Sequence, residues 1–419
     1  MRKIRGQLRK KIKFIHLSDI HIGLLTHGRL NPSTGYNTRL EDILRCLDHV
    51  LETAVRESVD LILIAGDVFH RENPLPAEEI EFARRIGKAA GKDGARVVMV
   101  LGNHDYSSSG AGASAVEIFP ALDIEGVTIA RKPGVIKVDT NSGMVQVACL
   151  PWAGRSALLT REEYRSLSSQ ELQAEIERRL ITIIHDLAGK TDPKDPAVLL
   201  AHVAARGARL SGTETDTLTT LDPVVPVTSL ADPAFQYVAL GHIHRFQDLN
   251  EGDAPPVVYS GSIERIDFTE EKEKKGFVLG EIMEAEGGWS CSYRFMETPA
   301  RKFITIDLGE IGSDQRGDPD LGRFSQVDTE GAVVRVRYEV GSPGEEVDEK
   351  AIRAAFAGAQ ALKIERIFSN PKKTMRQTEL SKTMNVLEAL EKYVQSRPEL
   401  KKIGDEMKSY AEKLIREDE

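Results

Sequence analysis

The chain has 419 residues, of which 41% are hydrophobic and 29% are charged, and its formal net charge is −9. These proportions are typical of a soluble globular protein with two or three domains, and they exclude a disordered chain. The negative charge argues against binding of nucleic acid through overall charge, while local basic patches stay open.

Several features bear on location. No apolar run approaches the roughly 20 residues needed to span a bilayer. The basic residues 1–13 lead into only a short apolar stretch, residues 14–17, and not into the roughly 7–15 apolar residues of a signal peptide. We interpret residues 1–13 as a solvated tail or an over-extended start codon, with DNA contact as the alternative. The three cysteines, Cys46, Cys149 and Cys291, do not suggest a disulfide framework. We therefore expect a cytoplasmic protein that does not contact a membrane.

The first hundred residues alternate between apolar strands and amphipathic helices. Strands are predicted at residues 13–17, 60–65 and 96–101, and helices at residues 39–57 and 76–90. Strands that alternate with helices predict βαβ units and a largely buried sheet.

Further along the chain the pattern becomes less regular. Strands are predicted at residues 145–150, 197–201, 234–240 and 257–259, and a long polar helix at residues 169–187. After Pro299 the character changes again. Alternating strands at residues 303–308, 332–340 and 362–368, a helix near residues 347–357 and a Gly/Asp-rich loop at residues 309–323 predict a small α+β unit.

The last segment follows residues 369–373 and contains two predicted helices that are broken near Pro398. Ser396 and Glu399 fit a capping box for the second helix. Apolar residues then recur at spacings of 3, 4, 3 and 4, namely Leu400, Ile403, Met407, Tyr410 and Leu414. This stripe has too little chain around it to be buried, so we expect it to dock on a partner coiled coil. Folding back on the chain's own domains, or dimerisation, is the alternative.

Five of the predicted strands are followed directly by Asp, Asn or His. These residues are Asp19 and His21, Asp67 and His70, Asn103, His104 and Asp105, His202, and His242 and His244. In α/β sheets ligands bind outside the carboxyl ends of the strands, so we expect these side chains to converge on one edge. A lone D-x-H or G-H-x-H is usually a structural turn or a satisfied core histidine. Five such endings outweigh that interpretation.

The types of side chain indicate a metal site. Imidazole mixed with carboxylate and amide oxygen, without thiolate, suits Mn, Fe or Zn. Seven ligands drawn from these ten residues are too many for one ion and suit two ions that share a carboxylate. Two ions about 3.5–4 Å apart fit in-line displacement at phosphorus. We expect His16, His49 and His185 to be structural, and we leave a functional role open for His27.

The motifs D-I-H, G-D-V-F-H, G-N-H-D, A-H and G-H-I-H resemble those of the calcineurin-like metallophosphoesterases. Within that superfamily the chain is most similar to the SbcD nuclease family, the bacterial counterpart of the eukaryotic double-strand-break repair nuclease. This similarity is carried by His70 directly after G-D-V-F, by Y-S-G-S-I-E-R-I-D-F at residues 259–268, and by K-K-G-F at residues 274–277. It covers residues 12–300 well and residues 300–370 more loosely.

The resemblance implies an α/β fold, a four-layer α/β/β/α metallophosphoesterase sandwich, over residues 12–298. It also implies a small α+β capping domain for DNA recognition at residues 299–370. A linker and a helix pair would follow at residues 371–419. The loop at residues 24–40 is longer than the family pattern, and the basic start is an extension, so both leave the shape of the DNA groove open.

The resemblance further implies roles for individual residues. Two groups of three residues would each bind one metal ion, and a shared carboxylate would bridge the ions. The first group is Asp19, His21 and His244, the second is Asn103, His202 and His242, and the bridge is Asp67. His104 would protonate the leaving oxygen or steady the scissile phosphate. His70 would orient the phosphate or assist that proton transfer.

The function implied is that of a two-metal DNA nuclease, typically Mn²⁺-dependent, in DNA repair and recombination. It would act as an exonuclease on duplex ends and as an endonuclease on single strands or hairpins. The family acts as a homodimer that pairs with SbcC, a coiled-coil ATPase. Residues 376–416 would contact this ATPase, and the complex would act at the nucleoid. One alternative is a metallophosphoesterase for small nucleotides or cyclic phosphodiesters, which the negative charge favours slightly. A scaffold with a decayed site is the other, and the complete ligand set argues against it.

Overall fold

The computed structural model describes residues 10–91, 94–106, 113–153, 167–212, 224–310, 324, 327–340, 347–368, 390, 393–394, 400 and 403–417. The chain divides into two compact units. The first comprises residues 1–306, 326–335 and 356–363, and the second comprises residues 307–325, 336–355 and 364–419. Among the described residues, no helix has both the length and the apolar character needed to cross a membrane.

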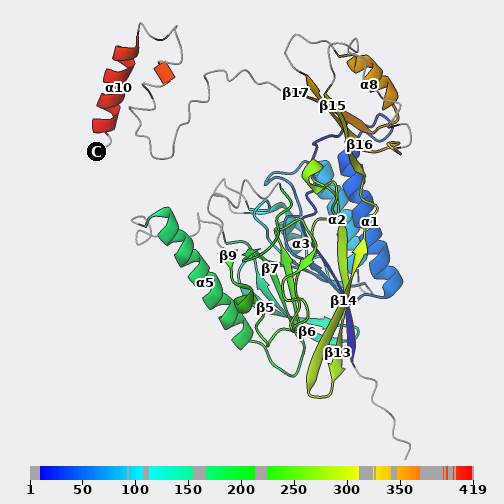
Figure 1. Ribbon diagram of the computed structural model, residues 1–419. Helices are drawn as coiled ribbons and strands as arrows, with labels where there is room; N and C mark the ends of the chain where they lie inside the picture. Colours follow the sequence, from blue (N-terminus) through cyan, green and yellow to red (C-terminus); the bar gives the residue numbers. More distant parts are fainter. Residues whose placement is uncertain are drawn as a thin grey trace, which may run out of the picture. The chain divides into compact units, whose positions relative to one another are not determined.

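The first large sheet has the strand order β14-β13-β1-β2-β3-β4. Its two last strands in the chain, β13 and β14, are labelled in Figure 1. Its strands are β1 (Lys11–Leu17), β2 (Leu61–Ile64), β3 (Arg96–Val100), β4 (Val127–Ala130), β13 (Gly276–Ala285) and β14 (Gly288–Glu297). Strands β1 to β4 run parallel, whereas β13 pairs antiparallel with both β1 and β14. Helices α1 (Thr38–Glu57) and α2 (Pro76–Ala90) connect the parallel strands.

The second large sheet has the order β11-β12-β10-β7-β6-β5. Its strands are β5 (Gly134–Thr140), β6 (Gly143–Leu150), β7 (Ala197–His202), β10 (Tyr237–Gly241), β11 (Gln247–Asp248) and β12 (Val257–Tyr259). Strands β6, β7, β10 and β12 are parallel. The connections include helices α5 (Ser169–Gly189) and α7 (Val227–Leu230).

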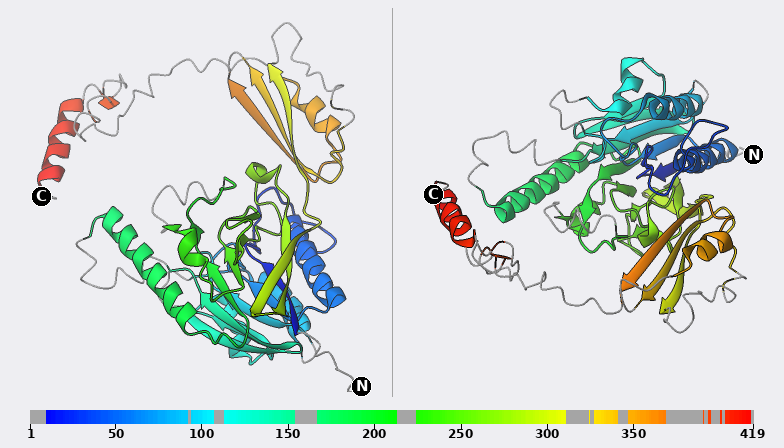
Figure 2. Two further views of the ribbon diagram at one scale, coloured as in Figure 1. Left: turned by 60° about the horizontal axis from the view of Figure 1, so that its bottom comes forward. Right: turned by 90° about the horizontal axis from the view of Figure 1, so that it is seen from above.

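Three apolar clusters separate four layers. One cluster joins α1 and α2 to the first sheet, for example Leu47 and Phe82 to Ile62. A second joins the two sheets, where Phe14 and Leu63 share a core with Leu200 and Tyr237 among others. A third joins the second sheet to α5 through residues such as Leu180 and Leu199. The predicted α/β/β/α sandwich is therefore confirmed (Figure 2).

Local chemistry explains where the long helices begin. The Asn37 side chain precedes α1 and accepts a hydrogen bond from the backbone N–H of Arg39 at 2.9 Å, which is the usual role of an N-cap. Pro76 occupies the first turn of α2, where its missing N–H has no partner to lose. Ser168 caps α5 and forms a capping box with Glu171.

Five strands of these sheets were not predicted from the sequence, and one of them, β11, has only two residues. Strands β4 and β5 are short or half-exposed, so they lack a long apolar run. Strands β13 and β14 form an antiparallel hairpin whose turn contains Gly287 and Gly288, both with positive φ. Their omission matters for the fold, because β13 is the strand that extends the first sheet beyond β1.

A separate three-stranded sheet follows, in the order β15-β16-β17, with strands β15 (Phe303–Glu310), β16 (Val333–Val340) and β17 (Ala361–Phe368). Helix α8 (Glu349–Ala355) lies between the last two strands in the chain. In the tail, helix α10 spans Gly404–Glu417. Most of the predicted loop at residues 309–323, the first tail helix and the Ser396–Glu399 capping box lie outside the described residues.

Candidate metal centre

The predicted site residues follow the carboxyl ends of five parallel strands. Asp19 and His21 follow β1, Asp67 follows β2, Asn103 follows β3, His202 ends β7, and His242 and His244 follow β10. The expectation of one sheet edge is corrected, because β1 to β3 belong to the first sheet and β7 and β10 to the second. The site therefore lies where the same ends of two packed sheets meet.

Four of these residues have a left-handed backbone. The φ angles are 51° for Asp19, 51° for His21, 52° for Asp67 and 103° for His242. Residues other than glycine seldom adopt such angles, and they concentrate at functional sites where the surrounding structure holds them. All four residues lie within four residues of the end of a strand.

The glycines of the motifs allow the strand ends to approach each other closely. A Cβ atom at Gly102 would collide with the Asp67 carboxylate and the Asp67 backbone nitrogen. One at Gly66, whose φ is +88°, would collide with the ring of His202. The glycines that begin G-D-V-F-H and G-N-H-D are thus needed for the approach of the side chains and not only for the turns.

Asp19, His21 and His244 form one compact and almost fully buried group. Their ligand atoms lie within 4.8 Å of one another. Nε2 of His21 is 3.1 Å from Nε2 of His244. The Asp19 carboxylate accepts a hydrogen bond from the backbone N–H of His242 at 3.1 Å, which fixes its orientation.

Asn103, His202 and His242 form a second group. Nδ1 of His202 is 2.7 Å from the Ala65 carbonyl oxygen, so this nitrogen carries the proton in the neutral ring. Its Nε2 then presents a lone pair 2.9 Å from Oδ1 of Asn103, and Nδ1 of His242 is 3.1 Å from the same oxygen. Nε2 of His202 and Oδ1 of Asn103 are therefore two acceptor atoms that face each other, as ligand atoms around a cation would.

Asp67 lies between the two groups. Its Oδ2 is 3.9 Å from Nε2 of His21 and 3.6 Å from Nε2 of His202. Its Oδ1 accepts a hydrogen bond from the backbone N–H of His104 at 2.9 Å. By distance, Asp19, Asp67 and His202 form a further group that could hold an ion. Both carboxylates are therefore close enough to serve more than one ion.

His70 and His104 flank the first group and are only partly buried. Their rings are stacked, with centroids 5.5 Å apart. Nδ1 of His104 is 2.8 Å from the His70 carbonyl oxygen, and Nδ1 of His70 is 3.4 Å from Nδ1 of His21. His21, His70 and His104 also lie close enough to hold an ion. A neutral imidazole has one lone pair, however, and Nε2 of His21 already faces His244.

The electrostatic environment favours neutral imidazoles. Burial, together with neighbouring histidines, holds the pKa values of His21 and His242 well below the ordinary histidine range. Burial lowers the pKa of His70 to about 4. Metal binding requires unprotonated imidazole, so His21, His242 and His70 are already in the form that an ion needs. The buried carboxylates and neutral imidazoles fit a divalent metal centre.

The sequence analysis missed three residues at this site. The ring of Trp152 is 5.0 Å from that of His242, and it could have been found because it lies two residues beyond the end of β6. Asp105 was noted only as a strand ending. Its carboxylate accepts hydrogen bonds from the backbone of Val68 and Gly102, which ties two strand ends together. The third residue, Glu270, contacts His244 at 2.9 Å.

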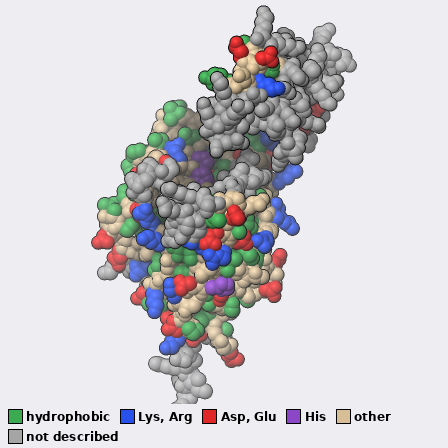
Figure 3. Space-filling model, turned by 90° about the vertical axis from the view of Figure 1, so that its left-hand side faces the viewer, with side chains coloured by type: hydrophobic (Ala, Val, Ile, Leu, Met, Phe, Trp, Pro, Cys, Tyr) green, Lys and Arg blue, Asp and Glu red, His purple; other side chains and the backbone are tan. Residues whose placement is uncertain are grey.

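The remaining histidines lie in other surroundings. His16 is fully buried, with Nδ1 3.1 Å from the Tyr237 hydroxyl, as a structural histidine would be. His27 lies with its ring 5.1 Å from that of Phe268, and it belongs to none of the metal-binding groups found among the described residues. On the face drawn in Figure 3, histidine side chains are visible in separate places, one of them within a hollow.

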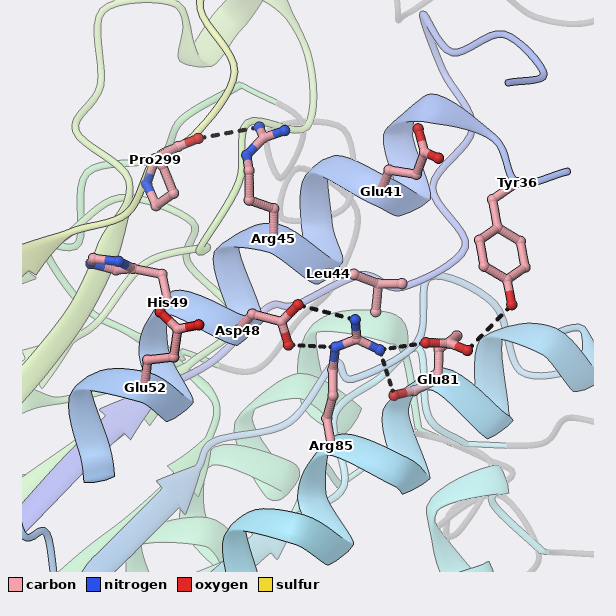
Figure 4. A pocket seen from close by; sticks show the side chains of 10 residues that line it. All are labelled: Tyr36, Glu41, Leu44, Arg45, Asp48, His49, Glu52, Glu81, Arg85 and Pro299. Atoms are coloured by element: carbon pink, nitrogen blue, oxygen red, sulfur yellow. Dashed lines mark hydrogen bonds and ion pairs between the residues drawn. The ribbon is translucent and has the colours of Figure 1, made fainter. Parts of the chain in front are cut away.

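A pocket of about 520 Å³ lies away from these groups, between α1 and α2 (Figure 4). Its charged side chains largely satisfy one another. Arg85 donates to both carboxylate oxygens of Asp48, at 2.7 and 3.0 Å, and to Glu81 at 2.5 Å. We therefore place the chemistry at the strand ends and not in this pocket.

The chain is similar to known proteins. The family described as calcineurin-like phosphoesterase matches residues 12–246. The DNA double-strand break repair protein Mre11 of Archaeoglobus fulgidus is 24% identical over 338 residues, which is 77% of this chain and 67% of that protein. A dimetal phosphatase from Danio rerio has a similar structure with a TM-score of 0.35 and 11% identity, covering 67% of this chain and 98% of the other.

Proposed function

Because the chain belongs to the calcineurin-like phosphoesterase family, we propose that it is a metal-dependent DNA nuclease of the SbcD type that acts in double-strand-break repair. The observation that carries the proposal is the meeting of seven Asp, Asn and His side chains from two sheets. The name of the Archaeoglobus fulgidus relative supports DNA as the substrate.

We assign Asp19, His21 and His244 to one ion, and Asn103, His202 and His242 to the other. Asp67 would be the ligand shared by both ions, because its Oδ2 faces a histidine of each group. The metal proposed is Mn²⁺, which mixed imidazole and oxygen ligands suit. Bound at these residues, two such ions would supply activation of the attacking water and compensation of the negative charge on the phosphate oxygens.

The proposed roles of His104 and His70 follow from their hydrogen bonds. Nδ1 of His104 donates to the His70 carbonyl oxygen, so Nε2 is the atom that can hold a proton for the leaving oxygen. Nδ1 of His70 faces Nδ1 of His21, which leaves its Nε2 for a phosphate oxygen. Both rings are partly exposed, as residues that meet a polymeric substrate must be.

For the rest of the chain we propose a nuclease domain at residues 12–298, a capping domain for DNA recognition at residues 299–370 and a partner-binding segment at residues 371–419. The partner is an SbcC-type coiled-coil ATPase, bound through residues 376–416. Exposed apolar side chains support this, since Tyr410 is 70% and Ile403 is 44% exposed. We further propose that the chain forms a homodimer and acts at the nucleoid.

The test is hydrolysis of labelled duplex, hairpin and single-stranded DNA by the purified chain, with Mn²⁺ or EDTA and a small nucleotide phosphodiester alongside. We expect the wild-type chain to cleave DNA when Mn²⁺ is present. We expect the His202→Gln variant to have lost this activity. His185→Gln is the matched control, because His185 is exposed on α5 and contacts Asp232. Hydrolysis of the small phosphodiester alone would replace the nuclease by a small-molecule phosphodiesterase, and no hydrolysis at all would overturn the proposal.

A further inference from the structure

The buried carboxylate of Glu270 contacts His244, one of the candidate metal ligands. Glu270 ends the 3₁₀ helix η3 (Phe268–Glu270) and is fully buried. Its Oε1 lies 2.9 Å from Nδ1 of His244, and its Oε2 accepts a hydrogen bond from the backbone N–H of Ile266 at 2.8 Å. Buried carboxylates need partners that compensate for lost hydration, and His244 is one of them.

The second partner is Lys275, which is also buried. Its Nζ is 2.8 Å from Oε2 of Glu270 and donates to the backbone carbonyl oxygen of His244 at 3.0 Å. Lys275 therefore balances the charge of Glu270 and also holds the main chain of His244. Both residues belong to the stretch around residues 268–277, to which the proposed nuclease mechanism assigns no role.

These contacts determine the state of the His244 ring. An ionised carboxylate only accepts hydrogen bonds, so Nδ1 of His244 carries the proton. Nε2 then presents its lone pair toward Nε2 of His21, 3.1 Å away, where the first ion is proposed. Carboxylates that orient ligand histidines in this way typically change metal affinity by about 10–100-fold when they are removed.

We propose that Glu270, held by Lys275, is a positioning residue of the metal centre that fixes His244 with Nε2 unprotonated and directed at the ion. This inference rests on the metal centre of the proposed function, and not on DNA as the substrate. Glu270 does not itself touch the substrate or the ions.

The competing explanation is that Glu270 is a structural ion-pair residue with no effect on metal binding. Glu264 provides the matched control, because it is buried to the same degree and is also part of an ion pair. Its Oε1 is 3.7 Å from Nη1 of Arg39, and its Oε2 accepts from the backbone N–H of Arg301 at 2.9 Å. None of its described hydrogen bonds or ion pairs reaches a candidate ligand.

The experiment is calorimetric titration of Mn²⁺ into metal-free wild type, Glu270→Gln and Glu264→Gln. Wild type should bind two ions. Glu270→Gln should bind one ion with wild-type affinity and the other about 10–100-fold more weakly, whereas Glu264→Gln should bind both ions as wild type does. Wild-type affinities in Glu270→Gln, or an equal loss in Glu264→Gln, would overturn the inference.

A second measurement needs no folded Glu270 variant. Nitrogen-15 histidine NMR of metal-free wild type should show His244 with a proton on Nδ1 and none on Nε2, the signals being assigned by their loss in His244→Gln. A proton on Nε2 would overturn the inference. Because the titration uses metal alone, a chain that binds two ions but leaves DNA intact overturns only the nuclease proposal.

Discussion

The Asp67 carboxylate lies 3.6 Å from Nε2 of His202, although Asp67 follows β2 of the first sheet and His202 ends β7 of the second. The apolar core between the sheets holds the two residues in register, since Leu63 of β2 and Leu200 of β7 belong to the same cluster. The candidate metal centre thus depends on the packing of the two sheets, and neither sheet alone contains both proposed ligand groups.

Asp67→Asn should weaken metal binding at the proposed centre. The variant keeps an oxygen that can accept from the His104 backbone N–H, but it loses the charge that faces both His21 and His202. We expect at least one ion to be lost and Mn²⁺-dependent cleavage to be abolished even at saturating Mn²⁺. Elemental analysis of the variant, together with cleavage assays, tests this. Two ions retained at wild-type affinity would contradict the bridging role.

His104→Ala should have the opposite pattern. His104 neighbours Asn103 in the chain, yet neither proposed ligand group requires it. We expect both ions to stay bound while the cleavage rate falls by about 10²–10⁴-fold, the usual contribution of a general acid. Metal content and duplex cleavage are to be measured on the same preparation. A rate near that of wild type would remove His104 from the mechanism.

The ligand positions could be predicted from the sequence because a strand's direction fixes where its last residue lies. Apolar runs that end in Asp19, Asn103 or His242 need no knowledge of distant contacts. Their division between two sheets could not be predicted in the same way. Strands β2 and β7 are both fully buried, so their sequences are equally apolar and carry no mark of the sheet to which they belong.

Other features differ in how far the sequence could reveal them. Strand β14 alternates between half-buried and exposed residues, and Trp289, Cys291 and Tyr293 recur at every second position, so this signal was available. The contact between Glu270 and His244 was not. It depends on Glu270 at the end of η3 reaching His244, which lies 26 residues earlier in the chain, and no local sequence pattern marks this contact.

His16→Gln should make the fold less sensitive to acid. Burial lowers the pKa of His16 from 6.5 to about 3, against a smaller opposing effect of the Leu240 carbonyl. Between these values the unfolded chain binds a proton that the folded chain does not, so stability falls as pH falls. This linkage amounts to ~1.4 kcal/mol per pH unit.

Urea unfolding in EDTA at about pH 6 and about pH 4 tests this linkage, with the free energy of unfolding compared between variant and wild type. The variant should be less stable near neutrality, because Gln replaces the His16 contacts with the Tyr237 hydroxyl and the Leu240 carbonyl imperfectly. The difference in the free energy of unfolding between wild type and variant should be smaller at the lower pH. Parallel pH dependences would show that His16 is not neutral in the fold.

The last prediction concerns the tail. Deleting residues 372–419 should leave Mn²⁺-dependent cleavage of short DNA largely intact, because the proposed ligands all lie before residue 245. It should abolish co-purification with the coiled-coil ATPase. Tyr410 and Ile403 are exposed on α10 and just before it, and each large apolar side chain buried in a complex contributes roughly 1.5–3 kcal/mol.

A finer test keeps the chain at full length. Changing Ile403 and Tyr410 together to Ser should weaken binding of the ATPase at least about tenfold, since about 1.4 kcal/mol corresponds to a factor of ten. Changing Asp405 and Glu406 to Ser is the matched control, because these residues are charged and exposed at the start of the same helix. Equal binding by both variants and wild type would mean that the apolar stripe serves the chain's own fold, and the partner assignment would then be wrong.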